Sequence, residues 1–252
     1  MKENKLFLHF FILLVFLISI AAISASDFNN TDNKDFNDLY YNIVVEDSNF
    51  TFECDYQFNS RCDENYSGGI NVTKDNFVIN GNNHIINCNN QSRAFYITGD
   101  KVEINNLIIE NAFYGYGSAI RPNCKLTLNN VTFINCFGDN ETYNCGAIYC
   151  ENSVLNINNC SGENGASLTS LSSTVNIVNS TFISSSDSII KGHIFLDNSN
   201  LTVDNSNFLN TTSKYATAIF FENDGEITSN DSPIKLNITP ARLKKFHNEE
   251  LK

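Results

Sequence analysis

Basic side chains, histidines and closely spaced cysteines are all scarce in this sequence. Its 16 Lys and Arg residues are outnumbered by 28 Asp and Glu, which gives a net charge of −12. A chain this acidic is repelled by phosphate backbones and by anionic lipid, so we expect no nucleic-acid partner. The four histidines show no spacing suited to a metal site, and we expect neither a metal nor a cofactor.

The first residues have the pattern of a secretory signal. Two lysines precede an apolar run from Leu6 to Ile18, and small residues follow it. This order predicts a signal peptide over residues 1–25, cut after Ser24 or Ser26. The alternative is an uncleaved segment, because the apolar stretch approaches the length that spans a bilayer. Contact with a membrane is expected only through that segment, and the rest of the chain is expected to be secreted or held at the cell surface.

The eight cysteines contain no Cys-x-x-Cys pair, so in an oxidising compartment they predict disulfides rather than metal ligands. Spacing suggests three candidate pairs: Cys54 with Cys62 around a polar loop, Cys124 with Cys150 in adjacent repeats, and Cys136 with Cys145 around an inserted loop. Eight cysteines allow 105 connectivities, so the alternatives stay open. Dense Asn-x-Ser/Thr sequons also fit a glycoprotein.

A short motif of alternating apolar and polar residues that ends in asparagine or glycine recurs along the chain. Its copies begin at Phe77, Val102, Leu126, Leu155, Val175 and Leu201. Their period, roughly 20 to 29 residues, is the range of solenoid repeats, and two further apolar stretches follow in most copies. The pattern therefore predicts an all-β fold, a right-handed single-stranded parallel β-helix of about six to eight coils with three strands per coil.

The expected organisation has four parts. They are the signal peptide at 1–25, a lead-in and N-terminal cap at 26–73, the β-helix repeats at 74–225, and a C-terminal cap or linker at 226–252. The N-terminal cap is predicted to include a short helix behind an N-capping Asp35, because Phe36, Leu39 and Ile43 recur at helical spacing.

The recurring asparagines have a predicted structural role. At a corner between strands the backbone leaves the β region, and asparagine tolerates the left-handed conformation better than any residue except glycine. We expect side-chain amides at equivalent corners to stack as a hydrogen-bonded ladder of Asn106, Asn130, Asn159, Asn179 and Asn205.

Two loops before the third strand are the candidate binding surface. Their aromatic and acidic residues should emerge side by side from adjacent coils: Phe113, Tyr114 and Tyr116 in the first, and Phe137, Asp139, Glu141 and Tyr143 in the second. Such a composition suits the stacking of sugar rings and hydrogen bonds to their hydroxyls. The alternative is that the rings fold back over the edge of the coil.

Three stretches carry a resemblance to a known family: the segment from Ile79 to Ile86, the recurrent Asn-Asn-Val-Thr-Phe-Ile-Asn type of coil, and the segment from Gly146 to Tyr149. About three-quarters of the chain resembles the right-handed parallel β-helix modules of archaeal, methanogen-type adhesin-like surface proteins. The resemblance implies attachment at the cell surface, with extracellular glycans or surface proteins as partners. Such proteins are usually longer, so the chain is either released or the N-terminal module of a longer surface protein.

An enzymatic role is the alternative, because the same pectin lyase-like coil occurs in polysaccharide lyases and hydrolases. Those enzymes need convergent carboxylates on one face. Most outward strand positions in this chain are Asn, Thr or Ser, and a cysteine nucleophile paired with His84 or His193 has little support. We therefore expect a non-catalytic protein with no catalytic residues.

Overall fold

The computed structural model describes residues 34–138, 146–165, 168–183, 193–209, 219–229 and 235–236. All of these lie within one compact unit, Lys34–Lys252. The predicted signal peptide and four loop residues named above, Asp139, Glu141, Tyr143 and Cys145, lie outside the described ranges.

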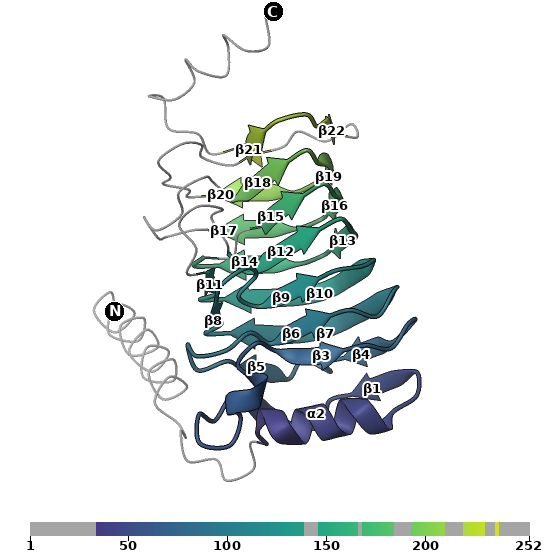
Figure 1. Cartoon of the computed structure of the whole chain (residues 1–252). Helices are drawn as coiled ribbons and strands as arrows, with labels where there is room; N and C mark the ends of the chain where they lie inside the picture. The colour runs from purple at the N-terminus through teal and green to yellow at the C-terminus, as the bar shows by residue number, and fades with distance from the viewer. Residues whose placement is uncertain are drawn as a thin grey trace, which may run out of the picture. The chain divides into compact units, whose positions relative to one another are not determined.

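The described chain is a parallel β-solenoid of about six turns, with one short α-helix at its N-terminal end (Figure 1). The predicted all-β parallel β-helix is therefore confirmed. Successive coils stack because each strand pairs in parallel with the equivalent strand of the next coil. Burying both the core side chains and the backbone hydrogen bonds in this way lets a short repeat form a stable structure.

Two sheets form the walls of the solenoid. One sheet has seven strands, namely β3 (Ile70–Val72), β6 (Phe95–Ile97), β9 (Ile120–Pro122), β12 (Ile148–Glu151), β15 (Leu168–Leu171), β18 (Ile194–Asp197) and β21 (Ile219–Glu222). The other has fourteen strands, which lie in two columns joined through the long strands β7 (Val102–Glu110) and β10 (Leu126–Ile134).

The first column also contains β1 (Asn49–Thr51), β4 (Val78–Asn80), β13 (Val154–Asn158), β16 (Thr174–Val178), β19 (Asn200–Asp204) and β22 (Ile227–Ser229). The second also contains β2 (Tyr56–Gln57), β5 (Ile85–Asn87), β14 (Ser161–Glu163), β17 (Thr181–Ile183), β20 (Asn207–Leu209) and β23 (Lys235–Leu236). The pair β8 (Phe113–Tyr114) and β11 (Phe137–Gly138) and a 3-10 helix, η1 (Glu64–Tyr66), complete the described elements.

The first two strands of a coil, which the repeat pattern predicted as separate, form one continuous strand in β7 and β10. In β7 the inward side chains change phase at Asn105 and Asn106, both of which point outward, and pairing with β10 continues on either side of them. A single residue in the left-handed conformation, Asn106 in β7 and Asn130 opposite it in β10, bends each strand here without ending it. The first two strands of a coil therefore belong to one bent sheet.

The core is made of apolar columns that run along the solenoid. One column joins Ile79, Ile104, Leu128, Ile157, Ile177 and Val203, all of them buried, through the pairing of successive strands. Each such side chain contributes about 1.5–3 kcal/mol when it leaves water, so the repeated columns are the main source of stability.

Helix α2 (Phe36–Val45) covers the open face of the first coil, as the sequence predicted, with Asp35 as its N-cap. Asp35 accepts a hydrogen bond from the backbone of Asp38, and the fully buried carboxylate of Asp63 accepts from the N–H groups of Phe36 and Asn37. At the other end, the Lys74 ammonium donates to the carbonyl of Val44 at 2.8 Å.

The first coil thus places a negative charge at the N-terminus of α2 and a positive charge at its C-terminus, which complements the helix dipole. This docking explains why a helix of ten residues is stable in this position. In the part of the chain that the structure describes, no helix has the length and apolar character needed to cross a membrane.

Asparagines in the left-handed conformation occupy all three corners of the coil. The first corner holds the five predicted residues Asn106, Asn130, Asn159, Asn179 and Asn205, with φ between 43° and 55°. Side-chain amides link Asn130 to Asn106 at 2.9 Å and Asn205 to Asn179 at 2.8 Å. A second ladder, which the sequence analysis missed, joins Asn111, Asn135 and Asn164 at the next corner.

The predicted disulfides were wrong for the cysteines that the structure describes. Cys54, Cys62, Cys124, Cys136 and Cys150 are all free thiols. The Cys62 thiol donates to Asp35, Cys124 lies against the backbone carbonyls of the preceding coil, and Cys136 and Cys150 are fully buried. Neither Cys54–Cys62 nor Cys124–Cys150 is bridged, and Cys136 has no disulfide partner among the described cysteines.

Two of the buried cysteines have a structural role at corners of the coil. Cys160 follows a left-handed asparagine, and its thiol lies 3.3 Å from the carbonyl two residues earlier. At the same corner one and two coils later, Ser180 and Ser206 make the same contact through their hydroxyls at 2.8 Å. Cys136 repeats this geometry at the second corner. Cys160 therefore occupies a corner position that serine fills in the next two coils, and Cys136 makes the same contact at the second corner, a role that spacing alone does not reveal.

Candidate functional site

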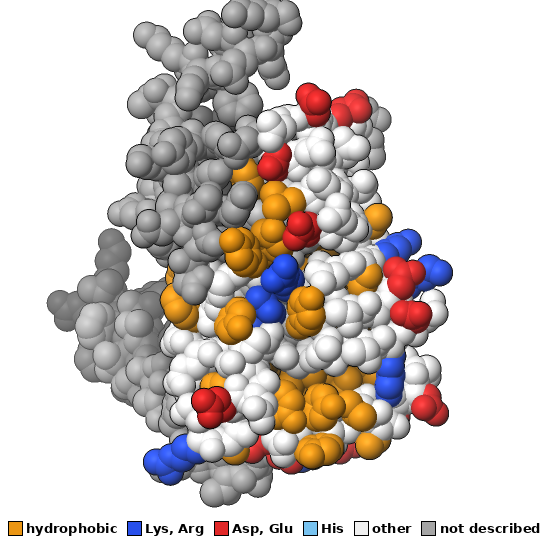
Figure 2. Space-filling view, viewed as in Figure 1, with side chains coloured by type: hydrophobic (Ala, Val, Ile, Leu, Met, Phe, Trp, Pro, Cys, Tyr) orange, Lys and Arg blue, Asp and Glu red, His pale blue; other side chains and the backbone are white. Residues whose placement is uncertain are grey.

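The outer surface of the seven-stranded sheet carries an unusual column of side chains. Strand pairing sets Asn71, Tyr96 and Arg121 side by side on β3, β6 and β9, and it places Tyr149 of β12 next to Arg121. Their neighbours in sequence point into the core. Figure 2 shows basic side chains over β9 bordered by hydrophobic ones. We call this surface the Arg–Tyr face and define it by Arg93, Tyr96, Phe113, Tyr114, Tyr116, Arg121 and Tyr149.

The loop strand β8 supplies the exposed rings of this face. Phe113 is 44% exposed and Tyr114 is 36% exposed, the two described residues of this surface with the greatest exposure of apolar area. β8 pairs in parallel with β11, which sets Phe113 opposite Phe137 of the next coil. Four of the seven candidate binding residues, Phe113, Tyr114, Tyr116 and Phe137, thus come from adjacent coils, and the other three lie outside the described ranges.

Arg93 holds the loop in place from below. It is only 4% exposed, and its guanidinium donates to the carbonyls of Gly117, Gly68 and Tyr116 at 2.7, 2.8 and 2.6 Å. The Tyr114 ring lies 4.5 Å from the guanidinium carbon, in cation–π contact. Burial, followed by the nearby charge of Arg121, lowers the pKa of Arg93 to about 10. Arg93 is therefore a positioning residue that fixes the loop between β8 and β9.

Arg121 presents a second guanidinium at the surface. Its carbon lies 5.3 Å from the Tyr149 ring centre, 5.8 Å from Tyr116 and 5.9 Å from Tyr96. Among the described residues its Nε has no hydrogen-bond partner, and Nη2 lies 4.0 Å from a carboxylate oxygen of Glu151. Three rings thus hold the guanidinium in one orientation; its Nε is buried, and the partly exposed side chain can offer its terminal Nη groups to a ligand.

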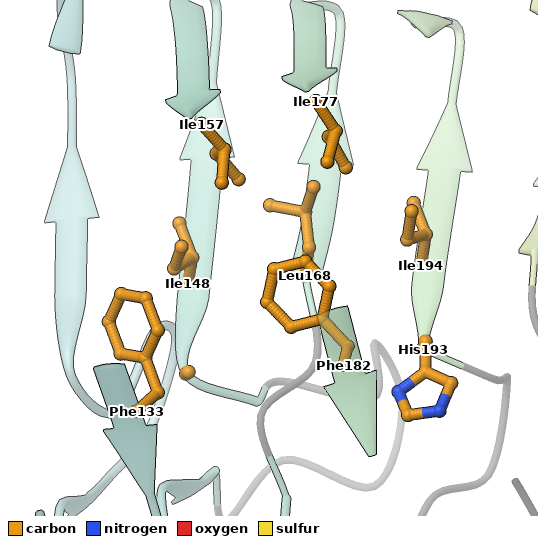
Figure 3. A pocket seen from close by; sticks show the side chains of 9 residues that line it. Phe133, Ile148, Ile157, Leu168, Ile177, Phe182, His193 and Ile194 are labelled. Carbon is orange, nitrogen blue, oxygen red and sulfur yellow. The ribbon is translucent and has the colours of Figure 1, made fainter. Parts of the chain in front are cut away.

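Within the described ranges the core contains a small gap, which Figure 3 shows from close by. Its volume is about 10 Å³, and Phe133, Phe182, Leu168, Ile177 and His193 are among the residues that line it. Gly162 pairs with Phe133 on one side and with Phe182 on the other, so a missing side chain in this column accounts for the gap. A volume that holds about one water at most is a packing defect, not a ligand site.

His84 and His193, the histidines considered as partners of a cysteine nucleophile, both contact other groups of the fold. His84 Nδ1 lies 3.0 Å from the Asp55 carboxylate, which also accepts from the backbone of Ile85. The Nε2 atom of the buried His193 lies 3.1 Å from the carbonyl of Leu209. Neither of these contacts is with a thiol, and both fix the path of a corner.

One group of potential metal ligands, Asp35, Cys62 and Asp63, lies beside the N-terminus of α2. Both oxygens of Asp63 already accept backbone N–H groups, including that of Asn59 at 2.7 Å. The group therefore has a clear structural task in docking the helix.

Three residues of this face, Arg93, Tyr96 and Arg121, were not predicted from the sequence. A usable signal was present: Tyr96 and Arg121 each follow the first apolar residue of a third strand, so the repeat places both on one outer column. Comparison of the chain with models of protein families, with curated proteins and with solved structures found no match. The Arg–Tyr face must therefore be interpreted from its own chemistry.

Proposed function

We propose that this protein is a non-catalytic, adhesin-like β-solenoid that binds carbohydrate at the cell surface or in the surrounding medium. The observation that carries the proposal is the pair of exposed rings, Phe113 and Tyr114, on a loop that Arg93 holds in place. Aromatic faces stack on the apolar faces of sugars, and adjacent donors bind their hydroxyl groups. The resemblance of the repeats to archaeal adhesin-like modules also supports a role in binding at the cell surface.

Rigidity of the site also favours binding. Arg93 donates hydrogen bonds to backbone carbonyls of two coils, Gly117 and Gly68, and so holds the loop in place. The aromatic rings on this loop therefore lose little conformational freedom when a ligand stacks on them. A ligand that contacts rings from adjacent coils would extend along the solenoid axis, where equivalent strands are about 4.8 Å apart. An oligosaccharide chain fits such a surface better than a compact small molecule does.

Glycan-array binding of the secreted chain tests the proposal. We expect the double variant Phe113→Ala/Tyr114→Ala to lose binding at least about 10-fold, because exposed aromatic anchors carry much of the energy of an interface. Tyr41→Ala is the matched control, since Tyr41 is 58% exposed on α2, away from the Arg–Tyr face. Thermal unfolding verifies that each variant is folded, and Phe113→Ala alone serves if loss of Tyr114 weakens the loop.

Unchanged glycan binding by a folded double variant would remove the assignment to this face. The same polysaccharides, assayed for new reducing ends after incubation, test the alternative of a carbohydrate-active enzyme. Turnover that survives repeated purification would replace the non-catalytic proposal.

Secretion is part of the proposal, and its support is the basic, apolar and small-residue order of residues 1–25. Free thiols are compatible with it, because burial raises the pKa of Cys136 to about 12 and of Cys160 to about 11, which leaves little reactive thiolate. We expect intact-mass measurement of the exported protein to show a chain that begins at residue 25 or 27. A full-length chain retained in membranes would instead identify an uncleaved anchor.

A further inference from the structure

We infer that the ligand of the Arg–Tyr face is an acidic saccharide, whose carboxylate or sulfate group is bound by the guanidinium of Arg121. The inference rests on the proposed function and names the chemical class of its ligand. It has two grounds. The face carries positive charge although the whole chain is acidic, and its two arginines differ, since Arg93 is bound to backbone carbonyls whereas Arg121 is not.

The chain carries a net charge of −12 and has only four arginines. Of the three that the structure describes, Arg61, Arg93 and Arg121, two lie on the Arg–Tyr face. An anionic ligand is repelled by the acidic surface in general, so a local cluster of cations determines where it can approach.

The charge of Arg93 is not neutralised by a carboxylate at its hydrogen-bonding nitrogens. Its three hydrogen bonds go to backbone carbonyls, which are neutral acceptors. The repulsion between the two guanidinium groups contributes to the lowered pKa of Arg93, after the larger effect of burial. An anion bound at Arg121 relieves this repulsion, and Arg93 strengthens its binding through a poorly solvated part of the protein.

Arg121 is free to take the contact that Arg93 cannot make. A guanidinium has five N–H donors in a planar fork that matches a carboxylate or sulfate. In the described part of the face, the ion pair of Arg121 Nη2 with Glu151 is long, at 4.0 Å, so the terminal Nη groups, and not the buried Nε, are the donors that can meet a ligand. The side chain is 30% exposed and is held by the rings of Tyr96, Tyr116 and Tyr149, so it is oriented before a ligand arrives.

The rings and the charge then have complementary tasks. Phe113 and Tyr114 stack on the sugar ring whatever its charge, whereas Arg121 distinguishes an acidic sugar from a neutral one. A charge-assisted, bidentate hydrogen bond predicts that the acidic form binds about 10- to 100-fold more tightly than the neutral form.

The experiment compares a polyuronate with the same polymer after reduction of its carboxyl groups to alcohols, which changes the charge and leaves the sugar backbone alone. A sulfated polysaccharide and its desulfated form make the second pair, so the two sources of negative charge are distinguished. Binding of the full chain is measured by calorimetry at low and high salt. We expect the acidic member of at least one pair to bind more tightly, with an advantage that shrinks as salt screens the charges.

Variants locate the effect. Arg121→Gln should abolish the preference for the acidic polymer, and Arg121→Lys, which keeps the charge but not the planar fork, should restore part of it. Lys125→Gln is the matched control, because it removes one exposed cation from the neighbouring corner and leaves the face intact. Its preference should equal that of the unmodified protein, and thermal unfolding confirms that all variants are folded.

Each other outcome is decisive. Equal binding of the acidic and neutral polymers overturns the inference and leaves the proposed carbohydrate function standing. An equal loss of preference in Arg121→Gln and Lys125→Gln overturns the role of Arg121, because net charge alone then explains the effect. No binding to any saccharide overturns both the inference and the proposed function.

Discussion

The outer surfaces of the two sheets are built on the same coils but use their side chains differently. On the fourteen-stranded sheet, Asn129 donates to Asn105 at 2.8 Å and Asn158 donates to Asn129 at 2.9 Å, so the same side chain recurs and binds its own copies. On the seven-stranded sheet, Asn71, Tyr96 and Arg121 differ at every coil. Repetition satisfies donors and acceptors along the axis, whereas a break in repetition leaves groups available to another molecule.

Substitution of Arg93 should have the largest effect on stability, because this residue of the non-repeating face holds a loop in place. Arg93→Met leaves three buried or half-buried carbonyls without their donor, and we expect a loss of about 3 kcal/mol of stability. Urea unfolding measures the change. Arg121→Met, its neighbour on the same face, should cost less than about 1 kcal/mol because its side chain is more exposed. Similar losses in the two variants would contradict the division between positioning and recognition.

The repeating corners should respond to backbone conformation. Asn130 has φ of 55°, and Asn130→Ala should cost about 1–2 kcal/mol because alanine disfavours the left-handed region. Asn130→Gly keeps that conformation and loses only the amide contacts, so it should cost less. Unfolding of protein made without glycosylation gives the comparison, and equal losses in the two variants would show that the amide contacts, which both variants lack, dominate over backbone conformation.

Adding a side chain at Gly162, where the apolar core column is interrupted, should have a smaller effect on stability and should increase it. Gly162→Ala places a methyl group beside the gap between Phe133 and Phe182 and should raise stability by about 0.5–1 kcal/mol. Gly165→Ala is the contrasting control, because Gly165 has φ of 84° and an added Cβ would lie 2.7 Å from the Cys136 carbonyl oxygen. Thermal unfolding should therefore shift upward for the first variant and downward for the second. A downward shift for both would show that the Gly162 site is already filled.

Cys160→Ser should have the smallest effect near neutral pH, under about 1 kcal/mol, because serine makes the same corner contact in the next two coils. Cys160→Val, which cannot donate, should cost more. Thermal unfolding under reducing conditions compares them. A stability loss in Cys160→Ser as large as in Cys160→Val would contradict the interpretation of these cysteines as corner donors.

Alkaline pH adds a second measurement to the same variant. Burial raises the pKa of Cys160 to about 11 from an ordinary value near 9. Between these values the unfolded chain loses a thiol proton that the folded chain keeps, so this contribution to stability is complete below pH 9 and is lost as the pH rises to 11. Cys160→Ser should therefore lose less stability than the unmodified protein over that window.

The sequence was a good guide wherever the fold repeats itself. The inward apolar residues, the N-capped helix and the left-handed asparagines are each required locally, so their spacing alone indicates a coil. The free thiol of Cys136 could not be predicted, because Cys136 serves as a corner donor and a corner is recognised only when coils are stacked. The Arg–Tyr face was found in part: the rings of Phe113 and Tyr114 stood out, but Arg93 and Arg121 did not.

The amino-acid sequence by itself therefore determined the solenoid, since period, alternation and asparagine corners are local properties that each coil repeats. Tertiary structure alone decided what lies next to what along the axis. Residues more than twenty positions apart, such as Tyr96 and Arg121, become neighbours only when the register of parallel strands is set. Register depends on the packing of the whole core, and it converts two unremarkable positions in separate repeats into one charged aromatic surface.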